Sequence, residues 1–297
     1  MTAQSVIKLQ SEEHEIIDPD FYATREEYVI NLMHLSDYQR ARVTVNDKDV
    51  LDLGCNSGYG TNLLSDTCKS IVGVDVSPMA IKTAKSKFNK SNLDFRVVDG
   101  ITLPFNDNSF DAITSFQVIE HLVDYESYFQ EIKRVLRPSG ILLLTTPNSK
   151  LRVRPGNKPW NRFHVHEFCG NELADLLFKY FSFIQVFGQF ANENTYLVEY
   201  NRCIKARDVI PNSENSRIFK SVMRNMLPVP VASFLRSILK KSDDGVALSE
   251  SEKSKYSLDD FYYQDNNLDA SLSLVACCSN NKDSQMDFTQ VFLHRDR

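Results

Sequence analysis

Cysteine is scarce in this chain and follows no ligand pattern: there are six in 297 residues and none forms a CxxC pair. This spacing argues against a disulfide-rich secreted domain and a cysteine-based zinc module, so we expect reduced, mostly buried thiols. No run reaches the roughly 18 apolar residues of a membrane span, and the first 20 residues lack the apolar stretch of a signal peptide. The resulting expectation is a cytoplasmic location.

Positive charge is not in excess either. The chain has 34 Lys and Arg against 39 Asp and Glu, a net charge of −5. A protein that wraps long nucleic acid needs clustered basic side chains against the phosphates, so nucleic acid is not an expected partner. The length and the 42% hydrophobic content suit one large α/β core, alone or with a small appended domain.

A glycine-rich turn follows the first apolar strand, in the sequence VLDLGCNSGYG of residues 50–60. Its glycines are Gly54, Gly58 and Gly60. Glycine reaches backbone conformations closed to other residues and lets a ligand approach the main chain. The dinucleotide fingerprint GxGxxG would need two further glycines where Asn56 and Tyr59 stand. The turn therefore predicts a nucleotide-type cofactor but argues against a nicotinamide one.

A second acidic strand end supports this prediction. Residues 71–76 (IVGVDV) carry Asp75 about 20 residues after the turn, where a ribose-binding acid belongs. Three later motifs are FRVVDG, FDAITSFQVIEHL and LRPSGILLLTTPN. Apolar runs alternate with helical periodicity, which predicts strands at 93–98, 141–146 and 183–187 and helices at 78–87, 125–136 and 172–180. The order is that of an α/β sheet.

Together these motifs resemble the class I S-adenosylmethionine-dependent methyltransferases, over roughly residues 48–190 and a final strand near 271–278. The resemblance implies a doubly wound, seven-stranded, mostly parallel Rossmann-like sheet with a helical insertion before the last strand. It also implies S-adenosylmethionine as cofactor. The expected segments are an N-terminal helical cover at 1–47, a cofactor-binding core at 48–187, a helical insertion capping the acceptor at 188–269, and a final strand and tail at 270–297.

The resemblance further implies roles for individual residues. Asp75 would accept hydrogen bonds from the ribose hydroxyls, for which one carboxylate has enough lone pairs. Asp99 would hold the adenine, and Asp52 would orient the turn or the methionine ammonium. The full predicted cofactor set is Asp52, Gly54, Cys55, Gly58, Gly60, Asp75, Val76, Asp99, Gly100, Phe116 and Gln117.

Methyl transfer from a sulfonium is already activated by the cofactor, so the protein mainly positions the reactants. An alcohol acceptor benefits from a general base, and histidine suits that task near neutral pH. The candidates are Glu120 and His121 after the fourth strand, and His164 and His166 in RFHVHEF. The last two alternate in what reads as an extended segment, which would place both on one face. Ordinary packing is the alternative for each.

A metal site is the second interpretation of the same region. Gln117, Glu120, His121 and His166 resemble the Glu-x-x-Glu-His and later His of RNA-terminal ribose methyltransferases, which bind a divalent ion. An amide oxygen is a poorer ligand for a hard cation than the carboxylate it replaces. We therefore expect no metal. Metal-dependent methylation of RNA ends stays an alternative function, as does a module that binds S-adenosylmethionine without catalysis.

The predicted insertion is the segment that should select the acceptor. Residues 216–241 have helical apolar spacing, six basic residues and no acid. Two basic amphipathic helices are expected, which either cover the active site or contact an anionic membrane at its inner face. Residues 242–255 read as a linker. TTPN followed by NRFHVHEF is similar to bacterial methyltransferases of polysaccharide and glycolipid biosynthesis, which implies O-methylation of a sugar hydroxyl on a glycan or glycolipid, or of a small metabolite.

Overall fold

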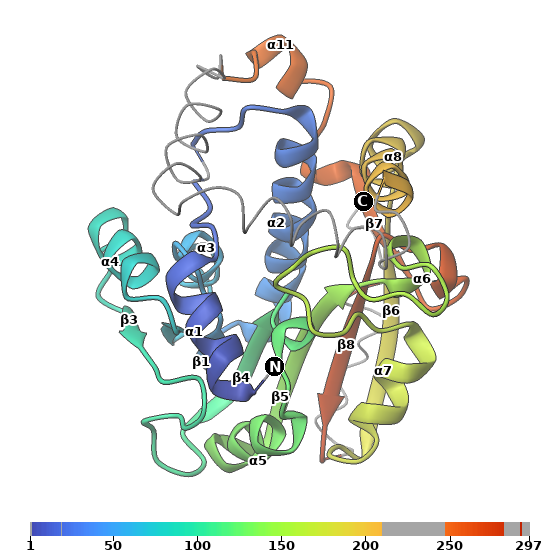
Figure 1. The fold of residues 1–297 in the computed structure, drawn as a ribbon. Helices are drawn as coiled ribbons and strands as arrows, with labels where there is room; N and C mark the ends of the chain where they lie inside the picture. Colours follow the sequence, from blue (N-terminus) through green and yellow to red (C-terminus); the bar gives the residue numbers. More distant parts are fainter. Residues whose placement is uncertain (1, 19, 210–246, 282–291, 293–297) are drawn as a thin grey trace, which may run out of the picture.

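The computed structural model describes residues 2–18, 20–209, 247–281 and 292. These residues contain one eight-stranded sheet of order β3-β2-β1-β4-β5-β8-β6-β7. Its strands are β1 (Asp49–Leu53), β2 (Ser70–Asp75), β3 (Leu93–Val97), β4 (Phe110–Phe116), β5 (Leu136–Pro147), β6 (Phe183–Ala191), β7 (Phe261–Gln264) and β8 (Ser273–Ser279). Figure 1 shows helices on both faces of this sheet, as the β-α alternation predicts.

The first five strands are parallel and end at a common edge. β1 lies between β2 and β4, and Leu53 is in register with Val74 on one side and Ser115 on the other. The carboxyl ends of parallel strands are where α/β sheets bind ligands. The turn after β1 and Asp75 at the end of β2 therefore lie beside one another, although 20 residues separate them in the sequence.

The other half of the sheet is antiparallel. β8 pairs with β5 and β6, and β6 pairs with β7, all in antiparallel fashion. Among the described residues there are thus eight strands where the resemblance implied seven, and three of the seven pairings are antiparallel. The additional strand is β7, inside the range predicted as a helical insertion. It has only four residues, too few for its alternating burial to be recognised in the sequence.

The helices begin and end at recognisable signals. They are α1 (Ala3–Glu13), α2 (Arg25–Val45), α3 (Tyr59–Leu64), α4 (Pro78–Lys87), α5 (Tyr125–Val135), α6 (Ser149–Arg152), α7 (Gly170–Leu177), α8 (Glu193–Val209) and α11 (Glu250–Lys253). Ser77 caps α4 by accepting from the Ala80 amide, and Pro78 occupies its first turn. Thr24 and Glu27 form a reciprocal capping box at α2.

Two predicted features of the insertion have different outcomes. The basic helices at 216–241 lie outside the described residues, whereas α11 falls in the stretch predicted as a linker. Among the described residues, no helix is both long and apolar enough to cross a membrane. All six cysteines are free and five are buried, as the composition predicts.

Apolar clusters cover both faces of the sheet. On one face Phe129 and Ile132 of α5 pack with Leu173 of α7 against the central strands. On the other, residues of α2 and α3 pack against β1, β4 and β5. The sheet is therefore a rigid base for the turns at its carboxyl edge. In Figure 1 the N-terminal helix α1, which lies within the range 1–47 predicted as a helical cover, lies in front of β1 and β4.

Candidate active site

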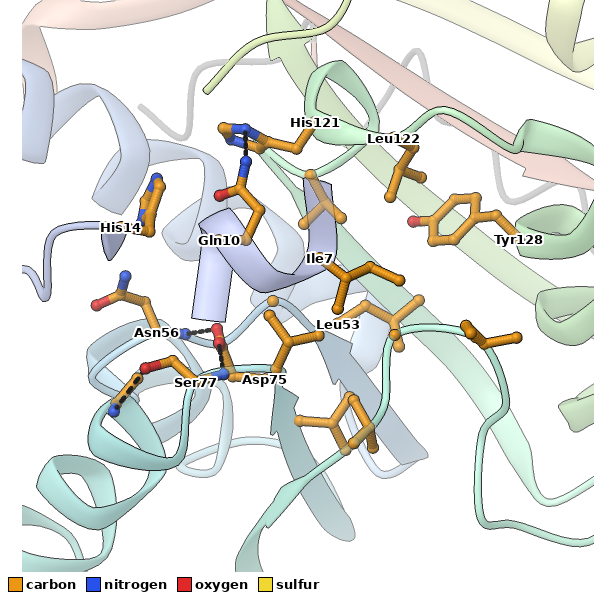
Figure 2. A pocket seen from close by; sticks show the side chains of 18 of the residues that line it. Ile7, Gln10, His14, Leu53, Asn56, Asp75, Ser77, His121, Leu122 and Tyr128 are labelled. Atoms are coloured by element: carbon orange, nitrogen blue, oxygen red, sulfur yellow. Dashed lines mark hydrogen bonds between the residues drawn. The ribbon is translucent and has the colours of Figure 1, made fainter. Parts of the chain in front are cut away.

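A cavity of about 180 Å³ lies at the carboxyl edge of the parallel strands. Figure 2 shows α1 crossing it, with Ile7 and Gln10 pointing inward above Asp75. Its floor comes from the turns after β1, β2, β3 and β4, and most of its wall is apolar. The cavity thus combines a largely apolar slot with two acids, Asp75 and Glu131.

Asp75 is the acid that the end of β2 contributes to this cavity, whereas Glu131 is paired with Arg134. One carboxylate oxygen accepts from the Asn56 amide at 2.9 Å and the other from the Ser77 amide at 2.8 Å (Figure 2). Each oxygen keeps a second lone pair, so the group can still accept two hydroxyls. Burial raises the pKa of Asp75, and the two amide hydrogen bonds oppose this rise. The two turns therefore hold the predicted ribose-binding acid in place.

The three glycines of the turn have different tasks. Gly54 lies on the cavity wall with φ of 72°, where an added Cβ would approach Val118 to 2.5 Å. At Gly58 a Cβ would instead meet the ring of Phe95 at 2.6 Å, and at Gly60 it would meet the ring of Tyr38 at 2.2 Å. Of the three, Gly54 lines the cavity, whereas Gly58 and Gly60 are not among the residues of the described cavity walls. All three glycines allow close packing within the protein, and Gly54 also presents its backbone to the cavity.

Asp52 is fully buried beneath the turn and is absent from the described cavity walls. Its carboxylate accepts from Thr61 at 2.6 Å and Thr114 at 2.7 Å, with the Tyr38 hydroxyl at 3.4 Å. Burial raises its pKa to about 6, opposed by these hydroxyl donors. The acid ties α2, α3 and β4 together, which fits the expectation that it orients the turn.

The structure places Asp99 outside the cavity. Its oxygens accept from the amides of Ile101 and Thr102 and from the Thr102 hydroxyl, so it closes a tight turn. These donors lower its pKa, and the side chain is exposed. Ile101 and Gly100 line the cavity instead, together with Val76 from the turn after β2. The surface available to an adenine is therefore apolar.

A second cavity, of about 320 Å³, adjoins the first. The residues common to both walls are His14, Gly54, Asn56, Gln117 and His121. Much of the second wall comes from distant segments: α2, α8 and the loop after β5, which supplies Trp160 and His164. Cys55 and Phe116, both predicted cofactor residues, also lie on this wall. We call the five shared residues the passage. A ligand in one cavity would face a ligand in the other cavity across it.

His121 occupies the passage. Its Nδ1 lies 2.9 Å from the carbonyl oxygen of Phe163 and 2.9 Å from the side-chain nitrogen of Gln10. Burial, with the neighbouring His164, lowers its pKa to about 3. His14 is the other imidazole of the passage, with its ring centroid 5.4 Å away, and burial lowers its pKa too. Both rings are therefore neutral at pH 7.

The structure separates His164 from His166. The His164 side chain is 7% exposed and its Nδ1 lies 2.6 Å from Glu167, whereas His166 is 49% exposed, 4.0 Å from Glu172. The expectation that the two share one face fails because residues 160–168 turn rather than extend. Of the two, only His164 lines a cavity.

Glu120 is a buried acid with a single side-chain donor. It is 1% exposed, and one oxygen accepts from the Thr146 hydroxyl at 3.1 Å. The other oxygen has no hydrogen-bond partner among the described residues. Burial raises the pKa of this carboxyl to about 8. It is therefore mostly protonated at pH 7.

A buried charge cluster supports the loop after β5. Arg152 lies 3.0 Å from Glu167 and 3.7 Å from Glu199, and Arg202 lies 2.6 Å from Glu199. Both guanidiniums also contact the ring of Trp160, at 4.6 and 5.2 Å from its centroid. Burial alone would raise the pKa of both glutamates, but their hydrogen bonds and the arginine charges hold these values low. Each charge in the cluster is paired.

Sequence reasoning missed Gln10, His14, Arg152 and Trp160. Gln10 and His14 lie in a segment with weak periodicity and no motif. The only available signal for Arg152 and Trp160 was their place in the loop after β5, at the ligand-binding edge.

Fold and cavity define a class: an α/β protein that binds a nucleotide-type cofactor at the carboxyl edge of its sheet. Residues 51–144 match the family described as a methyltransferase domain. The chain is 37% identical over 141 residues to a probable S-adenosylmethionine-dependent methyltransferase of Mycolicibacterium smegmatis, covering 47% of this chain and 54% of that protein. It is 33% identical over 132 residues to phthiotriol/phenolphthiotriol dimycocerosates methyltransferase 1 of Mycobacterium ulcerans, covering 43% and 46%.

The chain thus spans about half the length of the curated relatives it matches. A solved S-adenosylmethionine-dependent methyltransferase from Thermotoga maritima shares the fold, with a TM-score of 0.51 and 15% identity over 85% of this chain and 91% of that one. Residues 51–144 thus carry a methyltransferase domain, for which S-adenosylmethionine is the cofactor that the match and the named relatives imply. The described sheet is a mixed, Rossmann-like one.

The residues present fit that cofactor. Asp75 offers acceptors for ribose hydroxyls, and the apolar slot suits an adenine. At Gly54 and Gly100 an added Cβ would come within 3 Å of a neighbouring valine, so neither position has room for a side chain. The cavity is built around backbone that a ligand can approach.

Proposed function

We propose that this protein methylates an oxygen of a neutral, hydroxyl-bearing acceptor held in the second cavity, with S-adenosylmethionine held in the first. The observation that carries the proposal is that the two cavities share the five residues of the passage. A methyl transfer needs donor and acceptor in line at close range, and two adjoining cavities supply that arrangement.

The cofactor contributes an electrophilic methyl group on a sulfonium. The chain binds the cofactor and shields it from solvent. Asp75 would accept hydrogen bonds from the ribose, the ligand would contact the backbone at Gly54, and α1 covers the cavity. The acceptor hydroxyl must lose its proton as the new bond forms. His14 and His121 are the imidazoles of the passage that could accept it, and His14 is the better candidate because burial lowers the pKa of His121 to about 3 and makes that ring a weak base.

The charge balance of the second cavity supports a neutral acceptor. Arg152 and Arg202 are paired with Glu167 and Glu199, so neither of these arginines, the cationic side chains that the described wall contains, is left to bind an anion. Glu120 is mostly protonated at pH 7 and adds no negative charge. A sugar hydroxyl on a glycan or glycolipid, or a hydroxylated small metabolite, meets these conditions. The name of the M. ulcerans relative, a phthiotriol dimycocerosate methyltransferase, adds support for a hydroxyl-bearing acceptor.

The test is transfer of label from methyl-labelled S-adenosylmethionine to a lysate of the source cells, fractionated into glycan, lipid, RNA and small molecules. We expect label in the glycan, glycolipid or small-molecule fraction, and its loss with Asp75→Ala. Label in RNA would instead favour methylation of RNA ends. No label in any fraction would favour a binding module without catalysis.

A further inference from the structure

Three potential metal ligands meet on the wall of the second cavity. Glu120, His121 and His164 each present one ligand atom within 4.8 Å of the other two. They come from two segments 42 residues apart in sequence, the 3-10 turn η1 (Ile119–His121) and the loop after β5. The backbone joins these segments, because the amides of Val165 and His166 donate to the Glu120 carbonyl at 2.7 and 3.2 Å.

Both imidazoles are oriented by partners on the far side of the ring. Two groups meet Nδ1 of His121 at 2.9 Å: the Phe163 carbonyl, which can only accept, and the Gln10 side-chain nitrogen, which can only donate. In the tautomer with the proton on Nδ1, directed at the carbonyl, the Nε2 lone pair is free for a cation. Glu167 accepts from Nδ1 of His164, and the Nε2 of that ring then accepts from the Asn161 side-chain amide at 2.9 Å, a hydrogen bond that a bound cation would replace. A carbonyl or carboxylate behind the ring is the usual support of a metal-binding histidine.

The third ligand has an unused oxygen. One carboxyl oxygen of Glu120 is buried and lacks a partner among the described residues. A buried polar atom without a partner is costly, and a bound ion is one of its ordinary explanations. Two imidazole nitrogens and one carboxylate oxygen form a known ligand set for Zn²⁺ and for other first-row divalent cations.

We propose that Glu120, His121 and His164 bind a divalent transition-metal cation of the Zn²⁺ or Co²⁺ type. Three protein ligands leave a coordination position open, and here it faces the second cavity. An acceptor oxygen can take that position, and His14 then remains as the uncoordinated imidazole of the passage. This role toward the acceptor rests on the proposed methyl transfer, whereas binding of the cation does not.

The ligand set differs from the one suggested by sequence. His166 is exposed beside Glu172, and His164 takes its place. The side-chain nitrogen of Gln117 is 3.0 Å from the Thr145 hydroxyl, so the amide contributes to the support of β5. The expectation of no metal rested on Gln117 as a ligand, and the structure supplies three ligands without it.

The experiment is a titration of the full chain with Co²⁺ after removal of metals by a chelator. The visible absorption of Co²⁺ reports the number and type of its ligands, and competition with Zn²⁺ gives the relative affinity. We expect one cation per chain, binding lost with His164→Ala and Glu120→Gln, and binding about 10–100-fold weaker with Glu167→Gln. His166→Ala is the matched control, because it removes an exposed imidazole two residues from the site and should bind as the wild type does.

Binding of S-adenosylmethionine by each variant, measured by calorimetry, shows whether it is folded. His121→Ala provides a second ligand variant should His164→Ala not fold. A wild-type chain that takes up no Co²⁺ would overturn the proposal, as would folded ligand variants that bind as tightly as His166→Ala. Methyl transfer is assayed separately. Co²⁺ binding without methyl transfer would support the cation site and contradict the proposed function. Methyl transfer without Co²⁺ binding would contradict the cation site and leave the proposed function unaffected.

Discussion

The two cavities are built in opposite ways. The floor of the cofactor cavity comes from turns that directly follow parallel strands, largely within the segment that matches the methyltransferase domain, and its wall is mostly apolar. The second cavity is assembled from α2, α8 and the loop after β5, and is rich in charged and polar groups. Local backbone thus shapes the first, whereas contacts between distant segments shape the second. A substitution in the cofactor cavity should therefore mainly reduce cofactor binding, whereas a substitution in the second cavity should mainly reduce the stability of the fold.

The largest effect is expected at Asp75. Asp75→Ala removes the carboxylate expected to accept from the ribose hydroxyls, and two charge-assisted hydrogen bonds together contribute on the order of 3 kcal/mol or more. We expect S-adenosylmethionine affinity to fall by at least about 100-fold in calorimetric titration. Asp99→Ala is the control, and its affinity should stay near that of the wild type because Asp99 lies off the cavity wall. An equal loss in both variants would contradict the assignment.

In the second cavity the corresponding substitution is Arg152→Ala. It leaves Glu167 and Glu199 buried without their shared cation, and breaking a buried ion pair in this way costs about 3–5 kcal/mol. Urea denaturation should show that loss in the free energy of unfolding. Arg154→Ala, which breaks an exposed pair with Asp208, is the matched control and should cost under about 1 kcal/mol. Similar losses in the two variants would argue against a structural role for the cluster.

Two buried acids extend the comparison to pH. Asp52 has three hydroxyl donors and a pKa of about 6. Asp37 of α2 accepts from Tyr263 and Gln189 on one oxygen, and burial raises its pKa to about 8. Both pKa values exceed the value near 4 of an aspartate in the unfolded chain, so the folded state binds the extra proton between the two values. The free energy of unfolding therefore falls as pH rises from about 4. This fall continues to about pH 6 for Asp52 and to about pH 8 for Asp37.

Asp37→Asn should therefore flatten the decline in unfolding free energy between pH 6 and 8. Asp52→Asn should change the profile only below about pH 6. The measurement is urea denaturation at several pH values, and a wild-type profile that rises from pH 5 to 8 in step with these variants would contradict both assignments.

The smallest effect is expected at Gly60. An added methyl would overlap the Tyr38 ring, so Gly60→Ala should lower stability by about 1–3 kcal/mol. Cofactor affinity of the folded fraction should be unchanged, since the glycine is not on the described cavity wall. Gly54→Ala should lower both stability and S-adenosylmethionine affinity, because the added methyl would be strained at a φ of 72° and would meet Val118 on the wall of the cofactor cavity. Thermal melts with and without S-adenosylmethionine separate the two cases.

The sequence predicted the cofactor half well because its signals are local. Asp75, Val76, Gly100 and Gln117 line the first cavity, and the predicted strands and helices of the core lie within a few residues of those observed. Gly60 and Asp99 show the limit of such signals. Each belongs to the right motif, but Tyr38 and Thr102, which determine what they do, become visible only in three dimensions.

The second cavity was largely beyond prediction. His164 and His166 look equivalent in RFHVHEF, and only the turn of the loop toward η1 distinguishes them. The ring of Trp160 contacts the guanidinium of Arg202, which lies 42 residues away in sequence. Gln10 lies more than 100 residues from His121 and Phe163. No local pattern encodes contacts at such separations.

The position of α1 has a thermodynamic consequence. Val6, Ile7 and Gln10 of this helix form part of the cofactor cavity wall, and Gln10 also donates to Phe163 in the loop after β5. Docking of the helix and binding in the cavity are therefore linked equilibria, and each must favour the other by the same free energy. Occupancy of the first cavity should thus slow hydrogen exchange along residues 3–13, and the N-terminus becomes a reporter of the cofactor's presence.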